Sequence, residues 1–432
     1  MPTPFLVELQ SRLSDDEQRV LIPYLMTSER GQPIAFEGRH DVRDFIKGKI
    51  AQVRSGDTPE DCNTVIISGA PGAGKSSLLR QIQKEMSCDS VNHDVIPIFF
   101  EVSKLNDPVQ LLEMLLARRR VNFEGLSKSY TQDGKGRINL KLLQSGGGIY
   151  SNLPALDTSV RESPGRIWNV IRQSLYPGDD PIFLLLIDEA QRIGPKDGES
   201  NTLLTDMHGV ANLGGLKIIP VFAGLSDTGH RLKKAGITRP ADKDFKLRFL
   251  EAEEGISVCR GTFKALHVDK LFMPNDIDTV CMYLDNASDG WPRHLHHYVR
   301  YFVDEVLKSH NHGRDQVDLN RVLDLGHDNT IGYYQDRLSE TDFKLASLSL
   351  NDIAKQSSEQ IPITIKTFYD ALEGVIDPTN VEPLVHQYVH DGIFDENPDG
   401  TYEFPIPSLE TFLANDRDVE ATKKALQDGL RA

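Results

Sequence analysis

Long hydrophobic runs are missing from this sequence. The longest purely apolar runs are short, as at Ile182–Ile187, whereas a helix that crosses a bilayer needs about 20 such residues. The N-terminal residues MPTPFLVELQ also lack the basic and apolar regions that make up a secretory signal. We therefore expect neither a membrane-spanning segment nor a secreted protein.

Paired cysteines are also missing. The chain has four scattered cysteines and no C-x-x-C pair: Cys62, Cys88, Cys259 and Cys281. This spacing argues against a structural zinc site and against a disulfide framework. A reducing compartment suits such a chain, so we expect the protein to be cytoplasmic.

The composition is that of a water-soluble globular protein. Hydrophobic residues make up 39% of the chain and charged residues 26%, which are ordinary values for a folded soluble protein. A chain of 432 residues exceeds the size of a single hydrophobic core. We therefore expect about two or three domains.

A phosphate-binding pattern lies between Thr64 and Arg80, in the stretch TVIISGAPGAGKSSLLR. It fills every fixed position of G-x-x-x-x-G-K-[ST], with an apolar strand before the loop and a helical run after it. The residues that we expect to bind nucleotide are Gly69, Ala70, Pro71, Gly72, Ala73, Gly74, Lys75, Ser76 and Ser77. The alternative is a glycine-rich turn before an ordinary helix, but the complete pattern in this context favours nucleotide binding.

The spacing of this loop has a chemical reason. Gly72 and Gly74 let the backbone turn tightly around phosphate oxygens. Backbone N–H groups and the N-terminus of the following helix supply partial positive charge. Lys75 adds a full charge at the β- and γ-phosphates, and the Ser76 hydroxyl is a ligand for Mg²⁺. Ser77 is placed for a further phosphate contact.

Strand and helix patterns alternate through the first 250 residues. The expected strands are 64–67, 95–102, 181–187, 216–222 and 245–250. The helices expected between them are 75–86, 109–120, 166–175 and 203–213. This alternation predicts an α/β fold, in which a parallel sheet has helices on both faces.

Two carboxylates close the most apolar strand. Asp188 and Glu189 follow Ile182–Ile187, and in an open α/β sheet ligands bind at the carboxyl ends of the strands. Asp188 is therefore expected to hold a water of the Mg²⁺ shell, and Glu189 to polarise the water that attacks the γ-phosphate. Alone, the pair is equally well explained as solvated carboxylates that end a strand.

Three segments together carry a family resemblance. GAPGAGKSS, LLLIDEAQRI and IIPVFAGLSDT occur in this order, and the chain resembles an AAA+-type P-loop ATPase. Within that superfamily it is similar to the branch of origin-recognition initiators and transposition-regulator ATPases, over residues 31–310. The resemblance implies the three-layer P-loop NTPase sandwich, ATP and Mg²⁺ as ligands, and ATP hydrolysis.

The resemblance also suggests roles for two further motifs. Phe36–Arg39 is similar to a box beside the nucleotide base, which implies that Arg39 binds the cofactor. Gly290–Arg293 is similar to the G-x-x-R motif of the lid, whose arginine touches the nucleotide phosphates. Arg293 is therefore expected to act in catalysis.

A sensor residue and an arginine finger are implied in the same way. Ser226 or Asp227 falls at the sensor position, on the strand expected between the phosphate loop and the Asp-Glu pair. Relatives often have Asn or Thr there, so we choose Ser226. The arginine that reaches a neighbouring subunit's γ-phosphate is expected in LKKAGITRPAD; Arg239 is the first candidate and Arg231 the second.

The chain beyond residue 250 has helical patterns. A segment from about 336 predicts three helices and then a hairpin around Asn397–Gly400, which is the order of a winged helix. The expected domains are an N-terminal arm (1–35), an AAA+ ATPase core (36–250, with an insert at about 121–163), a helical lid (251–330) and a winged-helix-like domain (331–432).

Charge is spread unevenly along the chain, whose net charge is −16. Residues 118–141 contain 7 basic and 2 acidic side chains, with Phe123 and Tyr130 among them. This segment is either a DNA contact or a solvated helix end. Residues 331–432 contain 8 basic against 19 acidic side chains, which would repel the DNA backbone and favours docking of a protein.

Two functional hypotheses follow. In the first, the chain is an ATP-hydrolysing switch that assembles into a homo-oligomer and controls a partner acting on DNA, in a mobile-element or antiphage-defence setting. In the second, it is a signalling or scaffold ATPase with slow or no hydrolysis, which uses nucleotide as a structural clamp and docks an effector protein.

Overall fold

The computed structural model describes most of the chain, in several stretches. These are residues 6–9, 13–26, 34–56, 64–88, 94–102, 126–132, 138–144, 149–152, 181–193, 217–234, 243–339, 343–397 and 399–415. Two compact units emerge from the contacts within the chain. We call residues 40–68 and 78–246 the sheet unit, and residues 1–39, 69–77 and 247–432 the helical unit. Each is described by itself.

The sheet unit is built on a five-stranded parallel sheet with the order β3-β7-β8-β2-β9. The strands are β2 (Val65–Ser68), β3 (Val95–Glu101), β7 (Ile182–Asp188), β8 (Lys217–Gly224) and β9 (Lys243–Lys246). This confirms the α/β prediction of a parallel sheet. Only β9 departs clearly from its predicted range, since it begins before residue 245 and ends at Lys246.

Burial explains the sequence of these strands. Every residue of β7 is buried, as the uninterrupted apolar run predicts for a strand covered on both faces. β3 lies at the edge of the sheet, which suits Pro97 because proline cannot donate a ladder hydrogen bond. β8 lies between β2 and β7, the place that the sequence predicted for the strand before Ser226.

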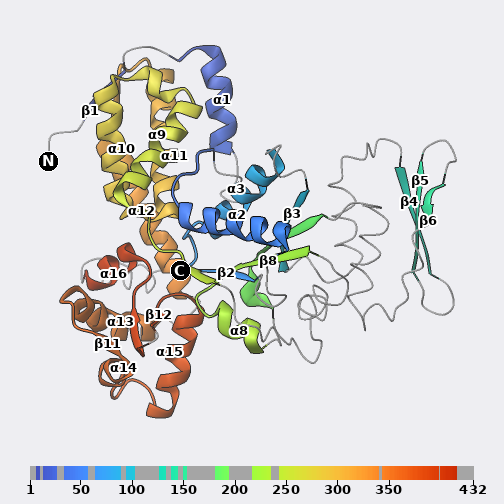
Figure 1. Cartoon of the computed structure of the whole chain (residues 1–432). Coiled ribbons are helices and arrows are strands. Elements are labelled where there is room, and N and C mark those ends of the chain that lie inside the picture. The colour runs from blue at the N-terminus through green and yellow to red at the C-terminus, as the bar shows by residue number, and fades with distance from the viewer. Residues whose placement is uncertain are drawn as a thin grey trace. The chain divides into compact units, whose positions relative to one another are not determined.

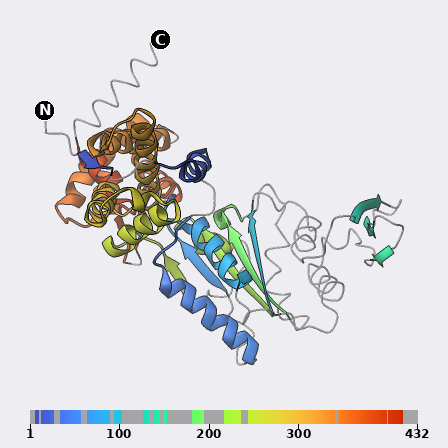
Figure 2. The same cartoon turned by 90° about the horizontal axis from the view of Figure 1, so that it is seen from above.

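Helices cover both faces of the sheet. They are α2 (His40–Ser55), α3 (Lys75–Cys88) and α8 (Thr228–Lys234). α2 packs against β7 and β8, and Figure 2 shows it running beside the strands. α2 and α3 lie on one side of the sheet and α8 on the other (Figure 1). The predicted helices 109–120, 166–175 and 203–213 lie outside the described residues.

The predicted insert contains a small antiparallel sheet. Its strands are β4 (Leu126–Gln132), β5 (Ile138–Gln144) and β6 (Ile149–Asn152), in the order β4-β5-β6. The sequence predicted an insert at about 121–163 and assigned no strand to it. Lys128 and Lys141 of the basic segment fall on β4 and β5, whereas Arg118–Arg120 lie outside the described residues.

The helical unit has its main core in a bundle. The bundle helices are α9 (Ala252–Ala265), α10 (Pro274–Ser288), α11 (Pro292–Asn311) and α12 (Leu319–Ser339), with a short helix η5 (Val268–Leu271) between α9 and α10. Leu284, Phe302 and Val306 are fully buried in this core. Among the helices that the structure describes, none has the length and apolar character needed to cross a membrane.

The N-terminal residues add two elements to this bundle. β1 (Leu6–Glu8) pairs antiparallel with β10 (Gln316–Asp318), and α1 (Asp15–Met26) packs against α11. Val7, Leu21 and Tyr24 are buried in the same core. No element was predicted here, because a three-residue strand has too little sequence for a periodic pattern and its partner lies some 300 residues away.

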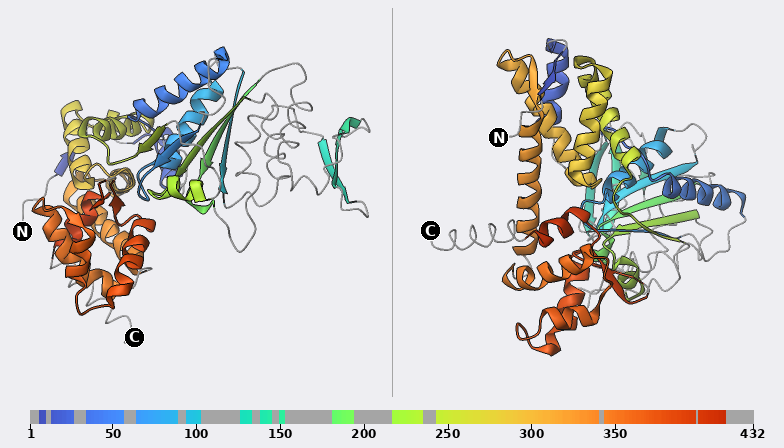
Figure 3. Two further views of the ribbon diagram at one scale, coloured as in Figure 1. Left: turned by 60° about the horizontal axis from the view of Figure 1, so that its bottom comes forward. Right: turned by 90° about the vertical axis from the view of Figure 1, so that its left-hand side faces the viewer.

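The C-terminal elements follow the bundle. They are α13 (Phe343–Ser358), β11 (Ile363–Thr364), α14 (Ile365–Ala371), η6 (Pro378–Asn380), α15 (Val381–His390), β12 (Asp395–Glu396), β13 (Thr401–Glu403) and α16 (Pro407–Ala414). β11, β13 and β12 form a three-stranded sheet, so the structure has the predicted hairpin. The first predicted helix was placed too early, because residues 336–339 end α12. Figure 3 shows α12 as a long orange helix beside the C-terminal elements. The winged-helix assignment stays a prediction.

Candidate functional site

The phosphate loop Gly69–Gly74 forms a tight turn between β2 and α3. Gly72 and Gly74 have φ values of +94° and +91°, a region that side chains other than glycine rarely adopt. The Ala73 N–H donates to the Ala70 carbonyl over 3.2 Å. The Lys75 ammonium donates to the carbonyls of Gly69, at 2.7 Å, and Ala70, at 3.0 Å. The lysine thus lies folded over the loop's own backbone.

The start of α3 has the chemistry of a phosphate site. The helix is 14 residues long and begins at Lys75, so its N-terminal N–H groups and its dipole favour an anion. Ser76 is exposed and Ser77 is half-buried in its first turn. One ammonium, backbone N–H groups and two hydroxyls form a donor set that fits a nucleotide's phosphates with Mg²⁺, for which Ser76 supplies an oxygen ligand.

The lid motif lies directly against this loop, inside the helical unit. A Cβ atom built on Gly72 would meet Trp291 Nε1 at 2.7 Å and Arg293 Cβ at 3.0 Å, so only glycine leaves room there. Trp291 is fully buried, and within the described part of the chain its indole N–H has no hydrogen-bond partner. The structure therefore places Arg293 beside the loop, and its contact with nucleotide phosphates stays a prediction.

Asp188 and Glu189 stand at the end of β7, in the sheet unit. Asp188 is buried, and its Oδ1 accepts the Glu189 N–H over 3.0 Å. Glu189 has φ +58°, a left-handed conformation that is uncommon outside glycine. Its carboxylate accepts Gln191 Nε2 at 2.7 Å and lies 3.4 Å from Arg192 Nε.

Gln191 is a site residue that the sequence analysis missed. Its amide donates to Glu189, while its Oε1 accepts the Leu225 N–H over 3.3 Å, one residue before Ser226. Gln191 therefore joins the ends of β7 and β8. The glutamine in the D-E-x-Q order was the only sequence signal, and it does not tell which strand the side chain reaches.

The sensor and finger candidates fall in different surroundings. Ser226 is half-buried in the turn after β8. Asp227 pairs with Arg231 at 2.5 Å, and Arg231 Nη1 donates to the Gln191 carbonyl over 3.3 Å. Arg231 thus has partners in its own subunit. Arg239 lies outside the described residues.

Arg39 ends the Phe36–Arg39 box in a strained conformation, with φ +55°. Its guanidinium donates to the backbone carbonyl of Arg248, and Arg248 Nη2 in turn lies 2.9 Å from Glu403 Oε1 on β13. Gly38 beside it has φ +77°, a conformation that favours glycine, and it lies against the Glu254 side chain. The box is therefore fixed to α9 and to the C-terminal elements.

The predicted site residues fall into two groups. The loop, Arg39 and Arg293 belong to the helical unit, and Asp188, Glu189 and Ser226 belong to the sheet unit. The chain itself joins the groups, since Ser68 ends β2 and Gly69 opens the loop. β2 pairs with β8 and β8 with β7, so all three strands end at one edge of the sheet.

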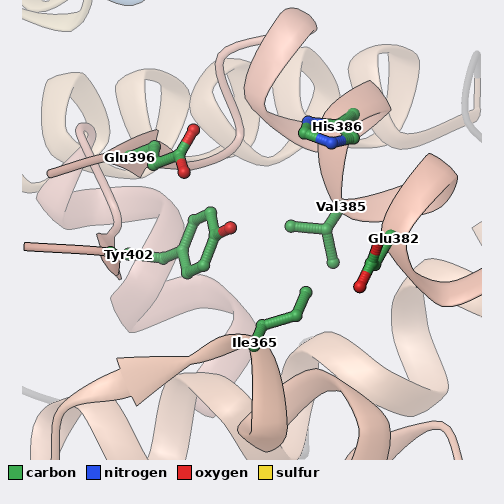
Figure 4. Close-up of a pocket in the computed structure, with 7 residues that line it drawn as sticks. Ile365, Glu382, Val385, His386, Glu396 and Tyr402 are labelled. Atoms are coloured by element: carbon green, nitrogen blue, oxygen red, sulfur yellow. The ribbon is translucent and has the colours of Figure 1, made fainter. Parts of the chain in front are cut away.

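A separate pocket of about 270 Å³ lies among the C-terminal elements. It is lined by Ile365, Glu382, Val385, His386, Glu396, Gly400 and Tyr402. In Figure 4 the ring of Tyr402 points toward Ile365 and Val385, with Glu396 and Glu382 on either side. Burial raises the pKa of Tyr402, and the charges of Glu396 and Glu382 raise it further. The pocket thus joins apolar walls to negative charge.

Comparison with known proteins agrees with this geometry. The family described as an AAA domain matches residues 58–224, which span the phosphate loop, the Asp-Glu pair and the end of β8. Comparison with curated protein sequences gave no match.

Solved structures share the fold at low sequence identity. The Walker-type ATPase of Pyrococcus abyssi is 16% identical, with a TM-score of 0.55, over 89% of this chain and 99% of that chain. The ORC2 protein of Aeropyrum pernix, solved as ADPNP–ADP complexes, is 14% identical, with a TM-score of 0.55, over 98% of this chain and 100% of that one. Residues 58–224 thus match the AAA domain family, and the motifs and the parallel sheet agree with a P-loop ATPase fold in this part of the chain.

Proposed function

We propose that the chain is an ATP-binding and ATP-hydrolysing switch that oligomerises and regulates a partner acting on DNA. The observation that carries the proposal is the loop Gly69–Gly74, where two glycines at positive φ and Lys75 form a phosphate cradle at the start of α3. Adenine is the base that we assign, because the fold-level neighbour from Aeropyrum pernix was solved with ADPNP and ADP.

Each residue has a separate task in this proposal. Lys75 leaves the carbonyls of Gly69 and Ala70 and contacts the β- and γ-phosphates. With Mg²⁺ bound, Ser76 would supply a ligand oxygen and Asp188 would hold a water of the metal's shell, and the metal would neutralise phosphate charge. Glu189 orients and polarises the attacking water, and Gln191 holds its carboxylate in place. Ser226 and Arg293 sense the γ-phosphate, and Arg39 lies beside the base.

Two substitutions test the core of this proposal. Lys75→Ala should remove nucleotide binding, while Glu189→Gln should keep binding and lower kcat by about 100-fold or more. Lys84→Ala, an exposed lysine further along α3, is the matched control and should behave as wild type. Hydrolysis by Lys75→Ala at the wild-type rate would reject the proposal.

Assembly of a composite site is the second part of the proposal. Arg231 is held by Asp227 and by the Gln191 carbonyl, which supports Arg239 as the arginine that acts on a neighbouring subunit. Arg239→Ala should then lower turnover strongly without changing nucleotide affinity, because a finger arginine stabilises the transition state. Mixing this variant with Glu189→Gln should restore part of the turnover. In the mixed oligomer, Arg239 of a Glu189→Gln subunit can act on the intact Glu189 site of an Arg239→Ala subunit.

We propose a mobile-element or antiphage-defence setting for this switch. Residues 118–141 are the proposed DNA contact. The excess of basic residues in this segment supports the contact, and two of them, Lys128 and Lys141, fall on the paired strands β4 and β5. Duplex DNA should stimulate ATP turnover in a salt-dependent way, and Lys128→Glu with Lys141→Glu should remove the stimulation. Unchanged stimulation in that variant would place the DNA contact elsewhere.

A protein partner is proposed for the acidic C-terminal elements. The pocket near Tyr402 fits a lysine or arginine side chain, because two carboxylates flank an aromatic face and apolar walls. A fluorescent polylysine peptide should bind at low salt, and the double variant Glu382→Gln/Glu396→Gln should weaken binding about tenfold. Glu359→Gln/Glu373→Gln changes the net charge equally at exposed acids outside the pocket, and equal weakening there would argue against the pocket.

The alternative function is a signalling or scaffold ATPase that keeps nucleotide as a structural clamp and docks an effector protein. The acidic pocket is the observation that favours it. Turnover with and without DNA, together with the mass of the protein in an ATP analogue, separates the two. DNA-stimulated turnover with a nucleotide-dependent oligomer supports the switch, and a fixed assembly with inert nucleotide supports the clamp.

A further inference from the structure

Tyr333 on α12 contacts two parts of the nucleotide site at once. Its hydroxyl donates to the backbone carbonyl of Pro71 in the phosphate loop, over 3.3 Å. The guanidinium carbon of Arg293 lies 4.3 Å from the centre of its ring, which is close enough for a cation–π contact. One side chain thus touches the loop backbone and the arginine of the lid motif.

The same hydroxyl is joined to the C-terminal elements. Arg337, one turn further along α12, donates from Nη1 to the Tyr333 hydroxyl over 3.0 Å and from Nη2 to the carbonyl of Asp391. Asp391 follows α15, and the next residue, Gly392, packs on the loop. A Cβ atom at Gly392 would lie 3.0 Å from Pro71 Cδ and 3.6 Å from Ala70 Cα.

A second set of contacts runs beside the first. His294, the neighbour of Arg293, has Nδ1 at 3.1 Å from Ser408 Oγ, and Ser408 Oγ lies 2.5 Å from the Tyr334 hydroxyl. Burial lowers the pKa of His294 to about 3, so the imidazole stays neutral and packs among these rings. Adjacent residues of α11 therefore meet adjacent residues of α12 and reach α16.

We propose that Tyr333 is a positioning residue that couples the state of the phosphate loop to the turn after α15. The inference rests on the proposed function, because it requires the loop to bind nucleotide. Lys75 bonds the carbonyls of Gly69 and Ala70 in this structure, and it must release them to contact phosphates. Ala70 and Pro71 are the residues on which Gly392 and Tyr333 rest, so this change acts directly on the coupled contacts.

The turn at Asp391 and Gly392 connects two elements that line the acidic pocket. Asp391 and Gly392 lie between α15, which supplies Glu382, Val385 and His386 to the acidic pocket, and β12, which supplies Glu396. A shift of this turn therefore moves two walls of the pocket relative to each other. Coupling between two sites in a protein typically changes affinity by about 5- to 150-fold.

Hydrogen exchange on the full-length chain tests the coupling. In wild type, Mg²⁺–ATP should slow or speed the exchange of backbone amides between residues 388 and 396. Tyr333→Phe keeps the ring under Arg293 and removes only the hydroxyl, so nucleotide affinity should fall by no more than about fivefold. At saturating nucleotide, the exchange response of residues 388–396 should nevertheless be lost.

Two further variants make the test specific. Arg337→Gln removes the link to Asp391 without touching the loop, and it should lose the same response while binding nucleotide as wild type does. Tyr369→Phe, an exposed tyrosine on α14, is the matched control and should keep the response. Binding is followed through Trp291, which lies beside Gly72, in a Trp168→Phe background, and by calorimetry on the unmodified chain.

The outcomes separate the two proposals. Wild-type exchange responses in both Tyr333→Phe and Arg337→Gln, with nucleotide bound, would overturn the coupling and leave the proposed ATPase function intact. A wild-type protein that binds no nucleotide would overturn the proposed function and the coupling with it. Loss of the response in both variants with binding retained is the result that we expect.

Discussion

At the scale of single residues, Asp285 is a buried carboxylate in the core of the helical unit, where charged side chains are uncommon. Its side chain is only 4% exposed, and its Oδ1 has no hydrogen-bond partner among the described residues. A Cβ atom at Gly255 would lie 1.8 Å from that oxygen, so α9 and α10 are in close contact there. Burial raises the pKa of Asp285 to about 6.

The sign of the pH dependence follows from that shift. In the unfolded chain an aspartate titrates near pH ~3.9, so the folded protein holds the proton more tightly. The free energy of unfolding should therefore fall as pH rises from about 4 to about 6, and the loss should be complete above that range. Ionised Asp285 is thus a cost that the folded protein carries at neutral pH.

Asp285→Asn should remove this cost. We expect the free energy of unfolding to rise by about 1 to 3 kcal/mol at pH 8 and to change little at pH 4, as measured by urea denaturation at both values. The exposed Asp370→Asn is the control and should change stability by less than about 0.5 kcal/mol. A variant that is less stable than wild type at pH 8 would show that the carboxylate has a partner.

At the scale of elements, the ends of β7 and β8 are joined by closely packed polar groups. A Cβ atom at Gly224 would lie 2.2 Å from Thr228 Oγ1 and 2.7 Å from Gln191 Oε1. The backbone N of Gln191 would also lie within 2.9 Å, so a rotation of one side chain does not relieve the clash. Gly224 therefore keeps Gln191, and through it Glu189, in position.

Gly224→Ala should separate catalysis from binding. Displacement of Gln191 frees the Glu189 carboxylate, so kcat should fall by about tenfold or more while the Kd for nucleotide stays within about threefold. Gly229→Ala on α8 is the matched control, because a Cβ atom there meets its nearest atom at 3.7 Å, an ordinary contact. Equal effects of the two substitutions would mean that Gln191 does not position Glu189.

Local pattern predicted the elements whose signal is local. The loop Gly69–Ser76 and the apolar strand Ile182–Ile187 each carry their signal in consecutive residues, and the structure has both at the predicted places. Gln191 and Tyr333 escaped prediction because each side chain bonds a backbone group far away in the sequence, at Leu225 and at Pro71. β1 was also missed, because its three residues form a strand only by pairing with β10, some 300 residues later.

At the scale of the whole molecule, nucleotide binding should change stability. A ligand that binds only the folded state at about 100 times its Kd adds about 2.7 kcal/mol to the free energy of unfolding. For 432 residues that unfold together, at about 2.1 cal/mol/K of unfolding entropy per residue, that corresponds to a rise in Tm of about 3 °C. Mg²⁺–ATP should produce this rise in wild type, as measured by differential scanning calorimetry.

Lys75→Ala should abolish the thermal shift, because it removes the charge that binds the β- and γ-phosphates. Lys84→Ala, exposed on the same helix, should keep the shift in full. An equal rise in Tm for wild type and Lys75→Ala would mean that the stabilising ligand binds away from the loop.

The pairing of β1 with β10 also has a consequence for synthesis on the ribosome. Leu6–Glu8 leave the exit tunnel early, whereas their partners Gln316–Asp318 are added some 300 residues later. At about 5 to 20 residues per second, the first strand waits for roughly 15 to 60 s. All residues of the sheet unit, 40–68 and 78–246, are made during that interval, so this unit can fold while β1 is still unpaired.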